Sequence, residues 1–177
     1  LPISNNILIM TSNQTEQSML EIINMALHLP PEITVTFITG NDINRQKSLQ
    51  ALADIHKNFT VIGYTKQVAY FMKKCSLVIT KPGGSTISEA IASGTPLVIV
   101  SPIPGMEEDN ARFLEDNGLG FWVHTPEKLL EFTTCLLNDP AKRRTVRKKM
   151  LTLHMSEAAD RIRDIILADL FRKNKVA

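Results

Sequence analysis

The chain has 177 residues, of which 44% are apolar and 21% are charged, and its formal net charge is +2. This composition is that of one ordinary globular domain, and it excludes a disordered or fibrous protein. No apolar run approaches the roughly 20 residues that span a bilayer, and the small net charge does not indicate a nucleic-acid-binding protein.

Short apolar runs alternate with helix-like stretches up to about residue 124. Continuous apolar runs predict strands buried on both faces, and apolar residues at helical spacing predict the helices between them. Strands are expected at 6–10, 33–38, 60–62, 77–80, 97–100 and 120–123. Helices are expected at 15–29, 44–56, 68–74, 85–93 and 107–116.

This alternation, with its short loops, predicts parallel strands joined by right-handed crossovers. The expected fold class is therefore α/β, a Rossmann-like doubly wound and mainly parallel sheet of six strands. After residue 124 the pattern is only helical, with helices expected at 126–137, 140–153 and 156–171. We expect one domain over residues 1–177, with a strand–helix core at 1–124 and a helical tail at 125–177.

The helical tail carries six positive charges within eight residues: Lys142, Arg143, Arg144, Arg147, Lys148 and Lys149. The favoured interpretation is a solvated helix face, and the alternative is contact with an anionic membrane surface. No aromatic residues alternate with these charges, which argues against a nucleic-acid partner.

The two cysteines, Cys75 and Cys135, lack the spacing of a zinc site. They predict reduced, buried thiols and hence a cytoplasmic protein. The chain begins with Leu rather than Met and shows no secretory leader, so we expect it to be a piece of a longer protein.

Ligands of open parallel sheets bind beyond the carboxyl ends of the strands. The loop after the fourth expected strand lies at such an end, and it has the features of a phosphate site. Gly83 and Gly84 let the backbone approach a ligand closely. Ser85 and Thr86 then open a helix whose free N–H groups and positive dipole end favour an anion. The loop lacks the Gly-Lys-Ser/Thr ending of a P-loop, and no glycine follows the first strand as in a dinucleotide-binding motif.

Glu89 lies four residues after Ser85, on the same face of the expected helix. A carboxylate there can accept hydrogen bonds from the two hydroxyls of a ribose. Its ordinary alternative role is to complement the helix dipole. Behind a Gly-Gly turn at the carboxyl end of a strand, we favour the ribose.

The fifth loop places Glu107, Glu108, Asp109 and Asn110 on the first turn of a helix that faces the same crevice. Acids at a helix start are ordinary capping chemistry. Alternating carboxylates and amides also suit the hydroxyls of a sugar. The sequence leaves these two interpretations open.

Residues 81–90 (KPGGSTISEA), 92–96 (ASGTP) and 104–111 (PGMEEDNA), followed by Gly118, resemble the C-terminal, donor-binding half of GT-B glycosyltransferases. Within that class the chain looks similar to the monogalactosyldiacylglycerol synthases and the processive diacylglycerol glucosyltransferases. These are relatives of the undecaprenyl-linked N-acetylglucosamine transferase of peptidoglycan synthesis. The pair Gly63-Tyr64 also fits the uracil-side loop of that family.

The resemblance implies a UDP-sugar donor and no metal or other cofactor. The implied substrate-binding residues are Gly83, Gly84, Ser85 and Thr86 for the diphosphate, Glu89 for the ribose, Gly63 and Tyr64 for uracil, and Pro104, Gly105, Glu107 and Asn110 around the sugar. Relatives carry a small Gly-rich loop after the first strand. Here Thr11 and Ser12 stand in that place, and their hydroxyls could reach a phosphate or sugar.

The resemblance further implies an inverting transferase that passes a hexose to a lipid, with diacylglycerol as the expected acceptor. The acceptor site and general base belong to an N-terminal half that this chain lacks, so no catalytic residue is expected here and the isolated chain should be inactive. We expect a cytoplasmic protein, peripheral at the inner face of a membrane. The alternatives are a separately encoded donor-binding subunit that needs a partner chain, and a domain of a GT-B-type UDP-sugar epimerase.

Overall fold

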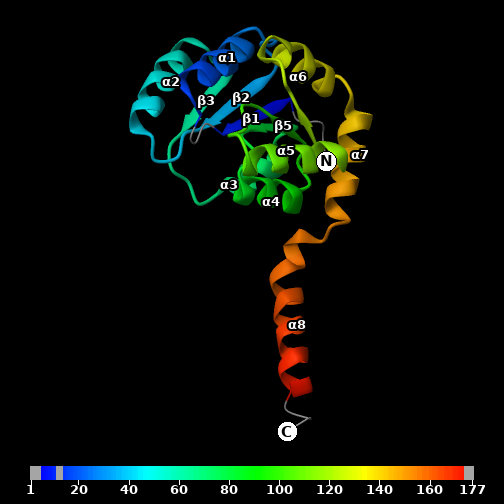
Figure 1. Ribbon diagram of the computed structural model, residues 1–177. Helices are drawn as coiled ribbons and strands as arrows, with labels where there is room; N and C mark the ends of the chain where they lie inside the picture. The colour runs from blue at the N-terminus through cyan, green and yellow to red at the C-terminus, as the bar shows by residue number, and fades with distance from the viewer. Residues whose placement is uncertain (1–4, 11–13, 174–177) are drawn as a thin grey trace.

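The computed structural model describes residues 5–10 and 14–173, and its centre is a six-stranded sheet (Figure 1). The strands are β1 (Asn6–Met10), β2 (Thr34–Ile38), β3 (Phe59–Ile62), β4 (Leu77–Thr80), β5 (Leu97–Ile99) and β6 (Gly120–Trp122). Their spatial order is β3-β2-β1-β4-β5-β6, and every neighbouring pair is parallel. The predicted Rossmann-like α/β class is confirmed, and the sheet is parallel throughout.

Helices cover both faces of this sheet, as Figure 1 shows. One face is covered by α1 (Glu16–Leu27), α2 (Ile43–Ile55) and α6 (Leu129–Leu137). The other is covered by α3 (Val68–Lys74), α4 (Gly84–Ser93), α5 (Met106–Asp116) and α7 (Pro140–Leu151). In β1, Ile7 and Ile9 pack into the first layer and Leu8 into the second. Burial on both faces explains why the strands are continuously apolar.

Several helices start where a side chain caps the free backbone N–H groups. Thr15, Asp42 and Asp139 accept hydrogen bonds from the backbone of Ser18, Arg45 and Lys142, at 3.2, 2.9 and 2.8 Å. The end of α4 is set by Gly94, whose φ of 64° closes the helix in the left-handed conformation.

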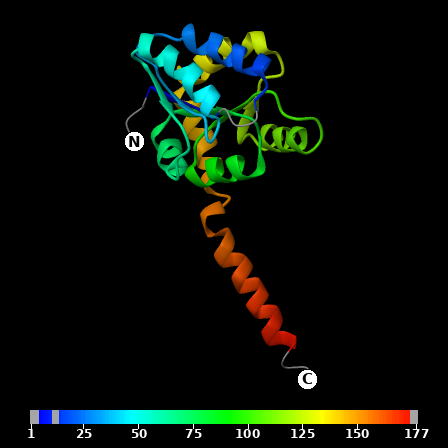
Figure 2. The same cartoon turned by 90° about the vertical axis from the view of Figure 1, so that its left-hand side faces the viewer.

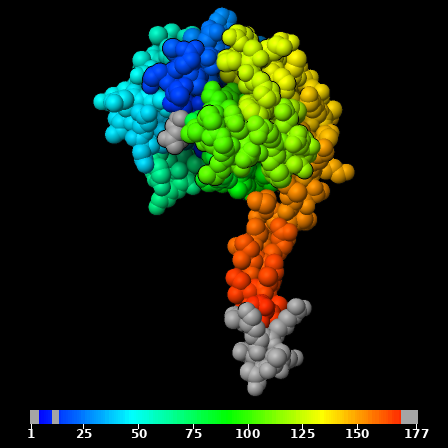
Figure 3. All heavy atoms as spheres, viewed as in Figure 1, coloured from blue at the N-terminus to red at the C-terminus, as the bar shows by residue number. Residues whose placement is uncertain are grey.

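The tail departs from the prediction in its details. The expected first tail helix divides into a 3₁₀ turn, η1 (Pro126–Lys128), and α6, and the last one into η2 (Met155–Glu157) and α8 (Ala158–Lys173). While α7 packs against the body, α8 projects away from it (Figures 2 and 3). Among the described residues, no helix is both long and apolar enough to cross a membrane.

The cluster of positive charges on α7 is only partly a solvated face, so the favoured prediction is wrong for two arginines. The buried Arg143 donates to the carbonyls of Leu136 and Leu137. Arg147 donates to the carbonyls of Ser93 and Gly94 at 3.1 and 3.0 Å. Both guanidinium groups satisfy the carbonyls at a helix end, which have no partner within their own helix.

The prediction of two buried thiols is wrong for Cys135, which is exposed, whereas Cys75 is half-buried. The buried positions of α6 are Leu129, Thr133 and Leu136, and Cys135 falls outside that face. Cys75 lies at the end of α3 and donates its thiol to the carbonyl of Met72 at 3.2 Å.

Candidate functional site

The strand order reverses beside β1, which has β2 on one side and β4 on the other. The loops that leave β1 and β4 lead to helices on opposite faces of the sheet, and it is at such a point that open parallel sheets bind ligands, in a crevice at the carboxyl edge. Residues 11–13 after β1 lie outside the described residues, so the contacts expected from Thr11 and Ser12 remain predictions.

The N-terminus of α4 forms one wall of this crevice. The helix begins at Gly84, one residue before the predicted start, and Gly83 precedes it in an extended conformation without a side-chain cap. The first intrahelical bond runs from the Ile87 N–H to the Gly83 carbonyl, so the amides of Gly84, Ser85 and Thr86 precede the helical ladder. A Cβ atom added at Gly83 or Gly84 would meet no atom within 4 Å. Free amides, the helix dipole and open space are the features expected of an anion site, and we call this helix start the cradle.

Glu89 lies one turn and a half into α4 and is exposed. Among the described residues, no cation lies within ion-pairing distance of its carboxylate. The carboxylate is therefore available to a ligand bound beside the cradle.

A nearly buried ion pair joins the fourth and fifth loops. Glu107 Oε2 accepts a hydrogen bond from the Ile103 backbone at 2.7 Å and lies 3.7 Å from Lys81 Nζ. The Lys81 side chain is 8% exposed and the Glu107 side chain 21%. Gly105, at φ 91° and ψ −120°, turns the chain into α5 just before this glutamate, in a region of backbone space that favours glycine.

Asn110 makes a second connection between the same loops. Its side-chain Nδ2 donates to the carbonyl of Pro82 at 2.9 Å. Glu107 and Asn110 together with Lys81 thus brace the start of α5 against the Gly-Gly turn. We call these three residues the loop brace. Its contacts use Glu107 Oε2 and Asn110 Nδ2, and they do not use Glu107 Oε1 or Asn110 Oδ1.

The role of Lys81 was not predicted from the sequence. Its partner is far along the chain, and only the fold brings the two loops together. The one sequence signal is a lysine directly before Pro-Gly-Gly, at the carboxyl end of a buried strand.

Gly63 and Tyr64 follow β3 at the same edge of the sheet. A Cβ at Gly63 would lie 2.7 Å from Gln46 Oε1, which is the end of a flexible side chain of α2 that can move aside. Tyr64 is 66% exposed. From β3 to β5 the sheet spans four strand spacings, about 19 Å. The predicted site residues that the structure describes therefore lie along one edge of the sheet.

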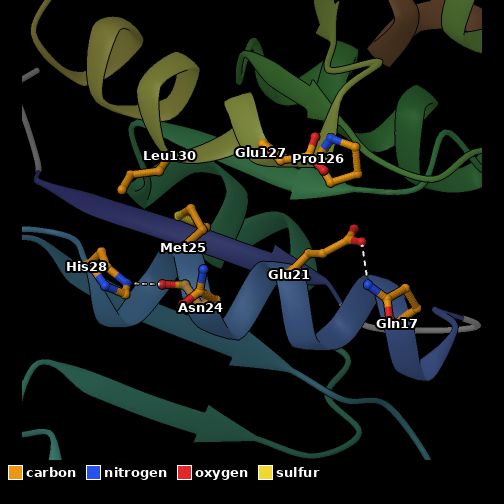
Figure 4. A pocket seen from close by; sticks show the side chains of 8 residues that line it. All are labelled: Gln17, Glu21, Asn24, Met25, His28, Pro126, Glu127 and Leu130. Atoms are coloured by element: carbon orange, nitrogen blue, oxygen red, sulfur yellow. Dashed lines mark hydrogen bonds between the residues drawn. The ribbon is translucent and has the colours of Figure 1, made fainter.

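A separate pocket of about 330 Å³ lies between α1 and the η1–α6 segment (Figure 4). It is lined by Gln17, Glu21, Asn24, Met25, His28, Pro126, Glu127 and Leu130. None of the predicted site residues lines it. Within the part of the chain that the structure describes, no group of three or more His, Cys, Asp and Glu side chains is placed to hold a metal ion.

The wholly parallel sheet, its strand order and the helices on both faces define a Rossmann-like α/β domain, and the fold is that of domains found in GT-B glycosyltransferases. The family described as the glycosyltransferase family 28 C-terminal domain matches residues 6–162, and the chain belongs to this family.

Three comparisons show the extent of the similarity. The processive diacylglycerol beta-glucosyltransferase of Bacillus pumilus (strain SAFR-032) is 33% identical over 153 residues, which cover 85% of this chain and 40% of that protein. The solved glycotransferase of kitacinnamycin gives a TM-score of 0.66 at 19% identity, over 90% of this chain and 43% of that one. The solved structure of MurG from Acinetobacter baumannii gives a TM-score of 0.64 at 23% identity, over 82% of this chain and 46% of that one. The chain spans less than half the length of each.

Proposed function

We propose that this chain is the donor-binding half of an inverting glycosyltransferase that moves a hexose from a UDP-sugar to a lipid, with diacylglycerol as the acceptor. The observation that carries the proposal is the open cradle at the N-terminus of α4. Two comparisons support the proposal: the chain belongs to the glycosyltransferase family 28 C-terminal domain, and it is similar to a protein named as a diacylglycerol glucosyltransferase.

In this proposal the diphosphate lies against the amides of Gly84, Ser85 and Thr86. Negative charge grows on the diphosphate as its bond to the sugar breaks, and oriented amides stabilise such charge without reorganising. The positive end of the helix dipole acts in the same direction. No metal or cofactor takes part, so a chelator should leave UDP binding unchanged.

The other donor groups are assigned to the neighbouring loops. Glu89 accepts the ribose hydroxyls, and the backbone at Gly63 and Tyr64 faces uracil. Pro104 and Gly105 shape the sugar end of the crevice. Glu107 Oε1 and Asn110 Oδ1, which the loop brace does not use, face the sugar.

The acceptor site and the general base lie outside this chain, in an N-terminal domain or in a partner chain. We also propose that the protein works in the cytoplasm as a peripheral protein at the inner face of a membrane, where its lipid acceptor lies.

Calorimetric titration with UDP and ADP tests the proposal, and the chain should bind UDP more tightly. Gly84→Val places a side chain in the space above the turn, where a Cβ atom meets no atom within 4 Å in the free protein. It should lower UDP affinity at least about tenfold. Ala51→Val, at an exposed position of α2, is the matched control. Equal affinity for UDP and ADP, or full UDP binding by Gly84→Val, would overturn the proposal.

A further inference from the structure

A groove at the C-terminal end of α7 combines positive charge with apolar surface. Its volume is about 480 Å³, and it is lined by Arg144, Arg147, Lys148, Leu151, Thr152 and His154. Arg144, Lys148 and Leu151 follow one another at helical spacing and share one side of α7. Thr152 and His154 come from the turn that follows the helix.

The charge in this groove is not neutralised by neighbouring acids. Within the described residues, no carboxylate oxygen lies within 4 Å of a side-chain nitrogen of Arg144 or Lys148. Glu157 lies at the rim, with its Oε1 3.3 Å from His154 Nδ1. Of the 20 Lys and Arg in the chain, six are on α7, which leaves 14 against 18 Asp and Glu elsewhere. Positive charge is therefore concentrated on this helix.

The groove is separate from the donor crevice. Helix α4 runs from the cradle at Gly84 to Ser93, and ten helical residues span about 15 Å. Arg147, which lines the groove, contacts the carbonyls of Ser93 and Gly94 at the far end of that helix. The cations of the groove cannot serve the donor diphosphate from there.

Apolar side chains accompany these cations. Leu151 in the groove is 45% exposed. After η2 the chain continues into α8, which projects from the body (Figure 2). Its Ile162 and Ile165 are 58% and 69% exposed. A small soluble anion needs only the charges, whereas a bilayer surface offers both phosphates and an apolar layer.

We propose that this groove binds the phosphate headgroups of anionic phospholipids and docks the domain on a bilayer. The test is sedimentation of the 177-residue chain with vesicles of phosphatidylcholine alone or mixed equally with phosphatidylglycerol. Binding should be at least about tenfold stronger with the anionic vesicles and should weaken as salt is added. Arg144→Gln with Lys148→Gln should lower that binding about tenfold or more.

The matched control is Lys47→Gln with Lys128→Gln, which removes the same charge from exposed positions of α2 and η1. It should bind vesicles like the unaltered chain, and circular dichroism melts should be alike for all three proteins. Equal binding to neutral vesicles, or undiminished binding by the α7 variant, would overturn the proposal. Complete displacement of the vesicles by inorganic phosphate at constant ionic strength would also overturn it and indicate a small-anion site.

Discussion

Lys81 and Glu107 form a nearly buried ion pair between the fourth and fifth loops. A nearly buried charge is costly unless its partner is present, so removing one member of such a pair is worse than removing both. We expect Lys81→Met and Glu107→Gln each to lower the free energy of unfolding, by about 1–3 kcal/mol. The double variant should lose less free energy of unfolding than the sum of the losses of the two single variants. Urea denaturation of all four proteins measures this coupling, and purely additive losses would show that the pair does not interact.

Asn110 combines a contact seen in the structure with one that is proposed. Asn110→Ala removes the hydrogen bond to Pro82 that braces the cradle, so UDP affinity should fall by about 0.5–1.5 kcal/mol. If Asn110 Oδ1 also faces the sugar, the affinity for a UDP-hexose should fall further than that for UDP. Calorimetry with both ligands decides this. Equal losses of affinity for UDP and for the UDP-hexose would contradict the proposed sugar contact and would leave Asn110 with its bracing role alone.

The two cysteines should differ in reactivity. Burial raises the pKa of the Cys75 thiol from 9.0 to about 12, so at pH 8 this group remains protonated in the folded chain. The thiolate is the reactive form, and Cys135 is exposed to solvent. A thiol-specific reagent should therefore label one cysteine rapidly in the folded protein and two after unfolding. Cys135→Ser should remove the rapid phase, and a rapid phase that survived would place the reactive thiol at Cys75.

At the scale of elements, α4 has glycines at both ends for different reasons. Gly94 has φ 64°, and a Cβ there would lie 3.1 Å from Leu151 side-chain atoms. Gly94→Ala should therefore lower the free energy of unfolding by about 1 kcal/mol or more. Gly84→Ala adds a Cβ that meets nothing, so it should be neutral or slightly stabilising. Thermal unfolding compares the two, and similar melting temperatures would contradict the distinction.

Most elements could be predicted because their local chemistry is sufficient. The strands are buried on both faces and so are continuously apolar, and Gly94 marks the end of α4. The 3₁₀ turns of the tail could not be predicted, since one turn of 3₁₀ helix has nearly the same pattern as one of α-helix. The loop brace could not be predicted either, because Pro82 and Asn110 are 28 residues apart and meet only in the folded sheet.

At the scale of the whole molecule, the chain is expected to transfer no sugar by itself. Transfer needs an acceptor hydroxyl about 3–3.5 Å from the anomeric carbon and a base within hydrogen-bond reach of it. The groups that we propose for the donor lie on one side of the crevice, and none of them is assigned to an acceptor. Incubation with UDP-glucose and diacylglycerol vesicles should yield no glycolipid, although the same sample binds UDP.

Each other outcome of that incubation has a definite meaning. Glycolipid formed by this chain alone would place the catalytic base within it. Activity restored by a second polypeptide would favour the separately encoded subunit. An isomerised UDP-sugar would favour the epimerase.

The parallel sheet also bears on the order in which the molecule can form. β1 needs β2 on one side and β4 on the other, and Ile7 pairs with Leu77, 70 positions further along the chain. Parallel neighbours cannot be made by a hairpin, and such distant pairings slow folding. During synthesis, β1 therefore keeps one bare edge until β4 has left the ribosome. A nascent chain that has emerged only as far as about residue 75 would expose that edge to other chains, so we expect aggregation at this stage.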